Sequence, residues 1–210
     1  MYVARFNAVD DEQEIRAMVS AIGSAELITI GPDGYPIASL VPVLWDGGTV
    51  IAHLARANPH WRTIGSVTPA LFVCTGPQAY VSPSWYAAKA EHGRVVPTWN
   101  YSAVHLTGTA VIHDDVEWTR QAVTALTRRH EDQRPEPWAV SDAPAAYVDA
   151  QLRAIVGVEF TVERVEAKAK LSQNRSEGDR AGVVDGLRAE GTSGASQVAE
   201  QMRLGPLDPL

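Results

Sequence analysis

Two tight turns near the start of the chain separate three short apolar segments, and this spacing limits the folds that the chain can adopt. The turns lie at residues 31–34 (Gly-Pro-Asp-Gly) and 46–48 (Asp-Gly-Gly). Glycine, proline and aspartate suit tight turns because they supply positive or preset φ angles. The segments beside the turns, at 25–30, 37–45 and 49–55, are short and apolar. Strands joined by such short loops are antiparallel neighbours, so the pattern predicts a β-meander.

The rest of the chain alternates further strands with helices. Strands are predicted at 70–75, 79–82, 99–113 and 158–168, and helices at 11–22, 114–130, 145–154 and 176–189. Six or seven strands with added helices predict a mainly β fold, a closed or partly closed barrel. No segment resembles an interdomain linker, so we expect one domain over residues 1–190. The tail at 191–210 is expected to be poorly ordered.

The composition narrows the classes of partner. The formal net charge is −7, from 18 basic and 25 acidic residues. A broad nucleic-acid surface needs a basic footprint, so direct DNA binding is doubtful. The single cysteine, Cys74, excludes an internal disulfide and fits a reducing compartment. No apolar run could span a bilayer and no signal peptide is recognisable, so we expect a cytoplasmic protein with no membrane partner.

A polar cluster falls where the strand at 49–55 ends and a short helix begins. Asn58 and Pro59 are suited to the N-cap and first turn of that helix. Arg56 supplies a permanently charged, planar fork that suits phosphate, with His53 close by in sequence. The cluster is therefore a candidate anion site. An ordinary capped helix with a surface arginine explains the same residues.

A second polar cluster follows the last predicted strand. Lys170, Ser172, Gln173 and Asn174 together supply donors for a phosphate or for the edge of a heterocycle. A polar turn is the alternative interpretation. If both clusters faced one cleft, they would bring cations and N–H donors to the same ligand.

Aromatic and hydroxyl side chains are dense at 80–86 and 96–101. Ser82, Trp85, Trp99 and Asn100 could line the face of a flat cofactor. Core packing at a barrel rim is the alternative. No metal site is predicted, although strand histidines His53 and His105 leave a histidine-bound ligand open.

Five motifs, in a fixed order, resemble the PaiB-type family of FMN-binding negative transcriptional regulators. They are HLARANPHW at 53–61, YVSPSWY at 80–86, VPTWNY at 96–101, VH at 104–105 with Gly108, and KAKLSQN at 168–174. The run Val3-Ala4-Arg5-Phe6 departs from the proline and His-Phe pair that the family usually has after its opening tyrosine. The loop at 87–94 is also longer than the family's minimal loop.

This resemblance implies a split β-barrel of about six antiparallel strands that forms a homodimer and holds FMN at the subunit interface. It implies a phosphate contact from Arg56, helped by His53 and Asn58. It also implies contacts to the phosphate, ribityl chain or ring from a second set of residues: Lys170, Ser172, Gln173 and Asn174. A third set would line the flavin face or the mouth of the site: Ser82, Trp85, Trp99 and Asn100. Two alternatives stay open: a flavin-dependent oxidoreductase acting on a small molecule, and a haem-binding split barrel with His53 or His105 as axial ligand.

Overall fold

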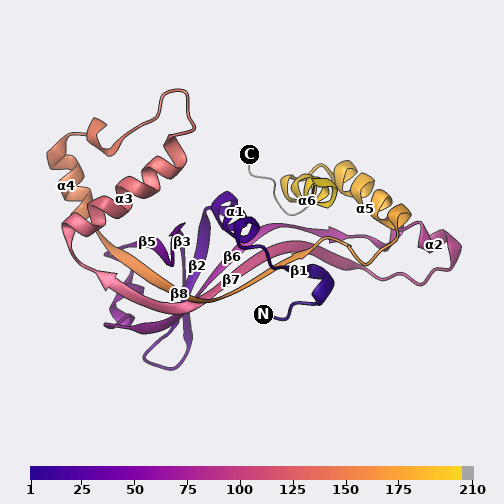
Figure 1. Cartoon of the computed structure of the whole chain (residues 1–210), viewed down its shortest axis with the longest axis horizontal. Coiled ribbons are helices and arrows are strands. Elements are labelled where there is room, and N and C mark those ends of the chain that lie inside the picture. Colours follow the sequence, from indigo (N-terminus) through magenta and orange to yellow (C-terminus); the bar gives the residue numbers. More distant parts are fainter. Residues whose placement is uncertain (205–210) are drawn as a thin grey trace. The chain divides into compact units, whose positions relative to one another are not determined.

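The computed structural model describes residues 1–204, and their contacts divide them into two compact units (Figure 1). Unit 1 comprises Met1–Ile22, Cys74–His105 and the chain from Glu166 onward. Unit 2 comprises Gly23–Val73 and Leu106–Val165. The one-domain boundary at residue 190 stays a prediction.

The described residues form eight strands in one antiparallel sheet, rather than the six or so expected. The strands are β1 (Ala8–Val9), β2 (Ser24–Ile30), β3 (Pro36–Pro42), β4 (Leu44–Asp46), β5 (Thr49–Ala55), β6 (Thr68–Val81), β7 (Thr98–His113) and β8 (Ile155–Lys170). Their order is β3-β2-β6-β7-β8-β5-β4, and β1 pairs with β8. The two strands predicted at 70–75 and 79–82 are one continuous strand, β6, which runs through Gly76 and Pro77.

Six α-helices lie among the same residues. They are α1 (Glu12–Ile22), α2 (Ala88–Glu91), α3 (Val116–Glu131), α4 (Ala145–Arg153), α5 (Glu177–Glu190) and α6 (Ser193–Leu204). The mainly β prediction with added helices is confirmed. Helix α6 lies within the tail that the sequence predicted to be poorly ordered, and its buried Val198, Ala199 and Met202 show why it packs. The last six residues of that tail, 205–210, lie outside the described part of the chain.

Both predicted turns form, but the strand predicted at 37–45 is two strands, β3 and β4, at opposite ends of the strand order. Unit 2 therefore contains two hairpins, β2–β3 and β4–β5, rather than the predicted continuous meander. In the first turn, the amide of Gly31 donates to the carbonyl of Tyr35 at 2.7 Å, and Gly34 has a φ of +84°. Strands β2 and β3 then pair from Ser24 opposite Pro42 to Ile30 opposite Pro36. The sheet buries an apolar core, because alternate residues of β2 and β5 point to the same face.

Helix α3 of unit 2 begins as its sequence predicts. The Asp115 side chain accepts a hydrogen bond from the amide of Trp118 at 2.8 Å, which is N-capping geometry. The indole of Trp118 packs against Gly157 of β8, where a Cβ atom would stand 2.1 Å from the ring. Because residue 157 is a glycine, the Trp118 indole can pack on this face of the sheet.

Unit 1 contains a helix that depends on glycine in the same way. Two glycines of α5 face Trp85: a Cβ on Gly182 would stand 2.1 Å from the Trp85 carbonyl oxygen, and one on Gly186 would stand 2.3 Å from its indole. The N-terminus of α5 is capped by Ser176, whose hydroxyl accepts from the amide of Asp179 at 3.2 Å. Local capping starts the helix and a close tryptophan contact fixes where it lies.

Candidate functional site

The predicted phosphate ligand Arg56 lies in unit 2, just after β5, and its guanidinium is fully engaged there. Its Nε donates to the carbonyl of Arg153 at 2.8 Å, and its two terminal nitrogens bind the carboxylate of Asp114. One of them also donates to the carbonyl of Ile155 at 3.3 Å. The hydrogen bond from Arg56 lowers the pKa of Asp114 and raises that of Arg56 itself. A phosphate would have to compete with Asp114 for this side chain.

Asn58 has the capping role that its position predicts. Its Oδ1 accepts from the amide of His60 at 3.0 Å, and its Nδ2 donates to the hydroxyl of Ser39 at 3.0 Å. The ring of His60 bonds the same Ser39 hydroxyl and that of Thr29, both at 2.9 Å. These bonds make Asn58 and His60 part of a buried network that holds the chain after β5.

The two strand histidines lie where expected, His53 on β5 and His105 on β7. Burial lowers the pKa of both rings. The Nδ1 atom of His53 is buried and has no hydrogen-bond partner. Among residues 1–204, no cluster of three or more metal-binding side chains occurs.

In unit 1 the second polar cluster contains a concentration of positive charge. Lys168 and Lys170 are two residues apart on β8, so their side chains leave the same face of the strand. The Lys168 ammonium donates to the carbonyl of Tyr2 at 3.1 Å and lies 5.1 Å from the centre of the Tyr101 ring. Lys168 is only 7% exposed. A buried ammonium of this kind is held by neutral groups rather than by an acid.

Lys170 and Arg175 complete this group, which we call the cation cluster (Lys168, Lys170, Arg175). Lys170 Nζ donates to the hydroxyl of Thr98 and, at 2.6 Å, to the carbonyl of Trp99. Burial lowers the pKa of Lys170 from its ordinary value of 10.5, and the charges of Lys168 and Arg175 lower it further. In the part of the chain that the structure describes, no member of the cluster pairs with a carboxylate.

The turn after β8 brings Arg175 to this place. Ser172 is the one non-glycine residue described with positive φ, at 62°. Its hydroxyl accepts from Asn100 Nδ2 at 3.0 Å, and both side chains are buried. The guanidinium of Arg175 then lies over the Tyr86 ring, 4.7 Å from its centre. Lys168, Arg175 and Tyr86 were missed as site residues, although all three stand inside or beside the quoted motifs.

The remaining predicted residues of unit 1 lie in three different places: the turn after β8, the cap of a short 3₁₀ helix, and the contact with α5. Gln173 folds back on the turn, because its Oε1 accepts from the amide of Leu171 at 2.7 Å, and Asn174 is exposed. Ser82 caps a short 3₁₀ helix, Pro83–Trp85. Trp85 packs on α5 as described above.

Trp99 is the aromatic side chain of this set most open to a ligand. It is 46% exposed, its Nε1 donates to Gln78 Oε1 at 3.0 Å, and its ring lies 6.3 Å from that of Tyr80. Since Lys170 binds the backbone of the same residue, an aromatic surface and the cation cluster are adjacent. The structure thus groups Lys170, Asn100, Ser172 and Trp99 in unit 1, whereas His53, Arg56 and Asn58 belong to unit 2.

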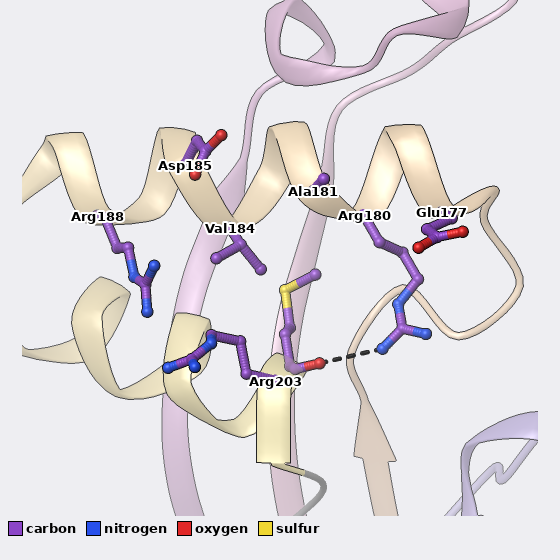
Figure 2. Close-up of a pocket in the computed structure, with 8 residues that line it drawn as sticks. Glu177, Arg180, Ala181, Val184, Asp185, Arg188 and Arg203 are labelled. Carbon is purple, nitrogen blue, oxygen red and sulfur yellow. Dashed lines mark hydrogen bonds between the residues drawn. The ribbon is translucent and has the colours of Figure 1, made fainter.

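A groove of about 380 Å³ lies between α5 and α6, and Figure 2 shows the side chains that line it. Arg180 reaches across it to the carbonyl of Met202 at 3.0 Å. Arg188 and Arg203 both face Glu200, at 3.7 and 3.2 Å. Their charge is thus already countered, and no residue of the predicted site lines this groove.

Comparison with known proteins matches the chain to one family. The model of the family described as "Putative FMN-binding domain" matches residues 1–164. The protease synthase and sporulation protein PAI 2 of Bacillus subtilis is 33% identical over 206 residues, which cover 96% of each chain. No helix within residues 1–204 is long and apolar enough to cross a membrane.

Solved structures share the fold at low sequence identity. The FAD and haem binding protein from Mycobacterium smegmatis matches with a TM-score of 0.60 and 17% identity, over 83% of this chain and 79% of that one. The flavocytochrome Anf3 from Azotobacter vinelandii matches with a TM-score of 0.54 and 15% identity, over 86% and 78%. These likenesses support the predicted split β-barrel fold. The family match and the Bacillus subtilis relative show that the chain belongs to the PaiB-type family.

Proposed function

We propose that this protein binds FMN and that the cation cluster receives the phosphate of the flavin. The observation that carries the proposal is the absence of any carboxylate partner for Lys168, Lys170 and Arg175 among residues 1–204. Burial lowers the pKa of the Lys170 ammonium, and the like charges of Lys168 and Arg175 lower it further, so the charged form of this side chain is disfavoured without an anion. A dianionic phosphate would relieve the repulsion and accept charge-assisted hydrogen bonds.

The surroundings of the cluster suit the rest of a flavin. Trp99 offers an exposed aromatic side chain, and its backbone carbonyl binds Lys170. Asn100 and Ser172 are buried and bonded to each other, so their proposed contacts with the flavin would require that pair to open. Gln173, Asn174, Ser82 and Trp85 remain proposed contacts on the strength of the family motif. Bound flavin would supply redox chemistry, while these residues would position the phosphate, ribityl chain and ring.

We further propose a homodimer with the flavin at its interface, and His53, Arg56 and Asn58 as contacts from the other polar cluster. The edge strand β3 and its neighbours expose apolar side chains, with Leu40 70%, Tyr35 72% and Ile30 61% exposed. A second copy of the chain could bury them. Because Arg56 is engaged by Asp114, its contact with phosphate would require that ion pair to rearrange.

The proposed role is a flavin-responsive regulator in the cytoplasm. The net charge of −7 argues for an indirect effect on transcription or for a partner that contacts DNA. A gel shift at nanomolar protein that weakens steeply with salt would instead establish direct binding.

The first experiment is the absorbance spectrum of the purified protein, followed by the mass of any released cofactor. Flavin bands and the mass of FMN would support the proposal, and the mass of FAD would correct the nucleotide. A Soret band without flavin would favour a haem protein. If the protein is colourless, titration with FMN should quench flavin fluorescence with saturation, and no saturable binding would refute the proposal.

A further inference from the structure

A small pocket lies between helix α3 and the sheet in unit 2, and none of the residues predicted for the flavin site lines it. Its volume is about 290 Å³. Ile51 of β5 and Ala122 and Ala125 of α3 form an apolar wall. The remaining lining residues are Trp118, Thr49, Gln121 and Glu159.

Two neighbouring strands, β8 and β7, hold the tryptophan of this pocket in place. Its indole lies on Gly157, and it stacks on His113 with ring centres 4.1 Å apart and planes 4° from parallel. The His113 Nε2 atom lies 3.0 Å from Glu159 Oε2. Glu159 pairs with Ile51 across the β5–β8 ladder, so carboxylate and apolar wall leave the same face of the sheet. The arrangement is preorganised rather than a loose surface crevice.

Three residues that line the pocket keep a hydrogen-bond acceptor. The Thr49 hydroxyl gives its proton to the carbonyl of Asp46 at 3.2 Å and keeps its lone pairs. Gln121 uses one amide N–H for Glu117 at 3.2 Å, which leaves its Oε1 as an acceptor and its second N–H as a donor. Glu159 has its second oxygen, Oε1, available beside the one that meets His113. A ligand that donates several hydrogen bonds would satisfy all three groups.

The charge of the pocket also favours a cationic ligand. Glu159 is the one charged residue among those that line it, so the pocket disfavours an anion. An ammonium or guanidinium would gain a charge-assisted hydrogen bond from the carboxylate. The two alanines and Ile51 accommodate a short hydrocarbon stem.

We propose that this pocket binds a small organic cation, a primary ammonium or guanidinium on a short apolar stem. Glu159 recognises the charge, Thr49 and Gln121 accept hydrogen bonds, and Trp118 packs against the stem. None of its lining residues is among those proposed for the flavin site, although Ile51 lies two residues before His53 on β5.

The test uses n-butylammonium chloride and its neutral analogue 1-butanol as probes. Each is titrated into the full-length protein and followed by ligand-observed NMR and calorimetry. We expect saturable binding of butylammonium, with butanol weaker by about ten-fold or more, which corresponds to about 1.4 kcal/mol. Equal binding of the two probes, or no saturable binding of butylammonium, overturns the proposal.

Two variants locate the binding. Glu159→Gln keeps the shape of the side chain and removes its charge, and it should weaken butylammonium binding about ten-fold while leaving butanol unchanged. Glu163→Gln, the same change at an exposed position further along β8, is the matched control and should bind as the wild type does. Ala125→Leu fills the pocket from α3 and should weaken binding of the cation. Unchanged affinity in both Glu159→Gln and Ala125→Leu would overturn the assignment.

Discussion

Lys170 donates a 2.6 Å hydrogen bond to the backbone carbonyl of Trp99, although the charges of Lys168 and Arg175 disfavour its ammonium and no carboxylate within residues 1–204 pairs with it. A lysine in an ordinary protein surface would turn outward to water under such repulsion. Here the carbonyl of Trp99 and the hydroxyl of Thr98 keep the ammonium at the cluster. The structure thereby preserves an anion-attracting position.

Lys170→Met tests this position. The variant keeps an unbranched side chain and removes the charge, so FMN affinity should fall by about 1.5–3 kcal/mol, the range for a hydrogen bond to a charged group. Quenching of FMN fluorescence gives the dissociation constant. Lys89→Met is the matched control, because the Lys89 ammonium also binds a hydroxyl, that of Ser84, at 3.0 Å but lies outside the cation cluster. Equal losses in the two variants would remove Lys170 from the site.

Gln201 is a candidate for stabilisation by substitution. It is 5% exposed, and both its amide oxygen and its amide nitrogen are buried without a hydrogen-bond partner. Gln201→Met keeps the length of the side chain and removes these unsatisfied groups, so the free energy of unfolding without flavin should rise by about 1–3 kcal/mol. Urea denaturation measures it. Gln197→Met, on the exposed face of the same helix, should change stability by less than about 0.5 kcal/mol. A destabilised Gln201→Met protein would show that the amide has partners.

Gly157→Ala should be destabilising because the new methyl group would meet the indole of Trp118 at 2.1 Å. Overpacking of this kind costs about 1–3 kcal/mol. Gly48→Ala, in a turn with nothing within 4 Å, is the control. A double-mutant cycle with Trp118→Ala should show that the cost of alanine at 157 shrinks once the ring is gone. An unchanged cost would place the clash elsewhere.

The buried ring of His60 predicts a dependence of stability on pH. Burial lowers the pKa of His60 below its ordinary value of 6.5, so the folded protein keeps the ring neutral where the unfolded chain takes up a proton. The stability contribution is therefore complete above about pH 6.5 and is lost as the pH falls toward the folded-state pKa. Urea denaturation at pH 7.5 and 5 should show a smaller loss for His60→Gln than for the wild type. His130→Gln, at an exposed position of α3, should lose as much as the wild type does.

Local chemistry explains which elements could be predicted. The turn at 31–34 and the caps at Asn58, Asp115 and Ser176 each depend on residues a few positions apart, and all of them form as expected. The apolar positions of α6 at 195, 198, 199 and 202 also follow a helical period. The small polar residues that begin this helix hid that pattern.

Long-range contacts could not be predicted in the same way. The two-residue strand β1 exists because Ala8 pairs with Lys168, some 160 residues later, and nothing near Ala8 signals it. Asp114 forms an ion pair with Arg56, which lies 58 residues earlier in the chain. The cation cluster depends on the left-handed backbone of Ser172, which brings Arg175 back toward Lys170. A serine gives no sequence signal for that conformation, whereas a glycine would have done so.

The contact between Trp85 and the two glycines of α5 links the order of distant parts of unit 1. Each glycine inside a helix costs about 1 kcal/mol relative to alanine, so α5 is a weak helix by itself. Part of its stability therefore comes from packing against Trp85, about a hundred residues earlier in the chain, and part from packing against α6. An isolated peptide of this segment should be largely unstructured, and truncating the indole should weaken the helix while the hairpins of unit 2 persist. Evolution can accordingly adjust how firmly the carboxyl-terminal region is held by changing one aromatic side chain in a remote loop.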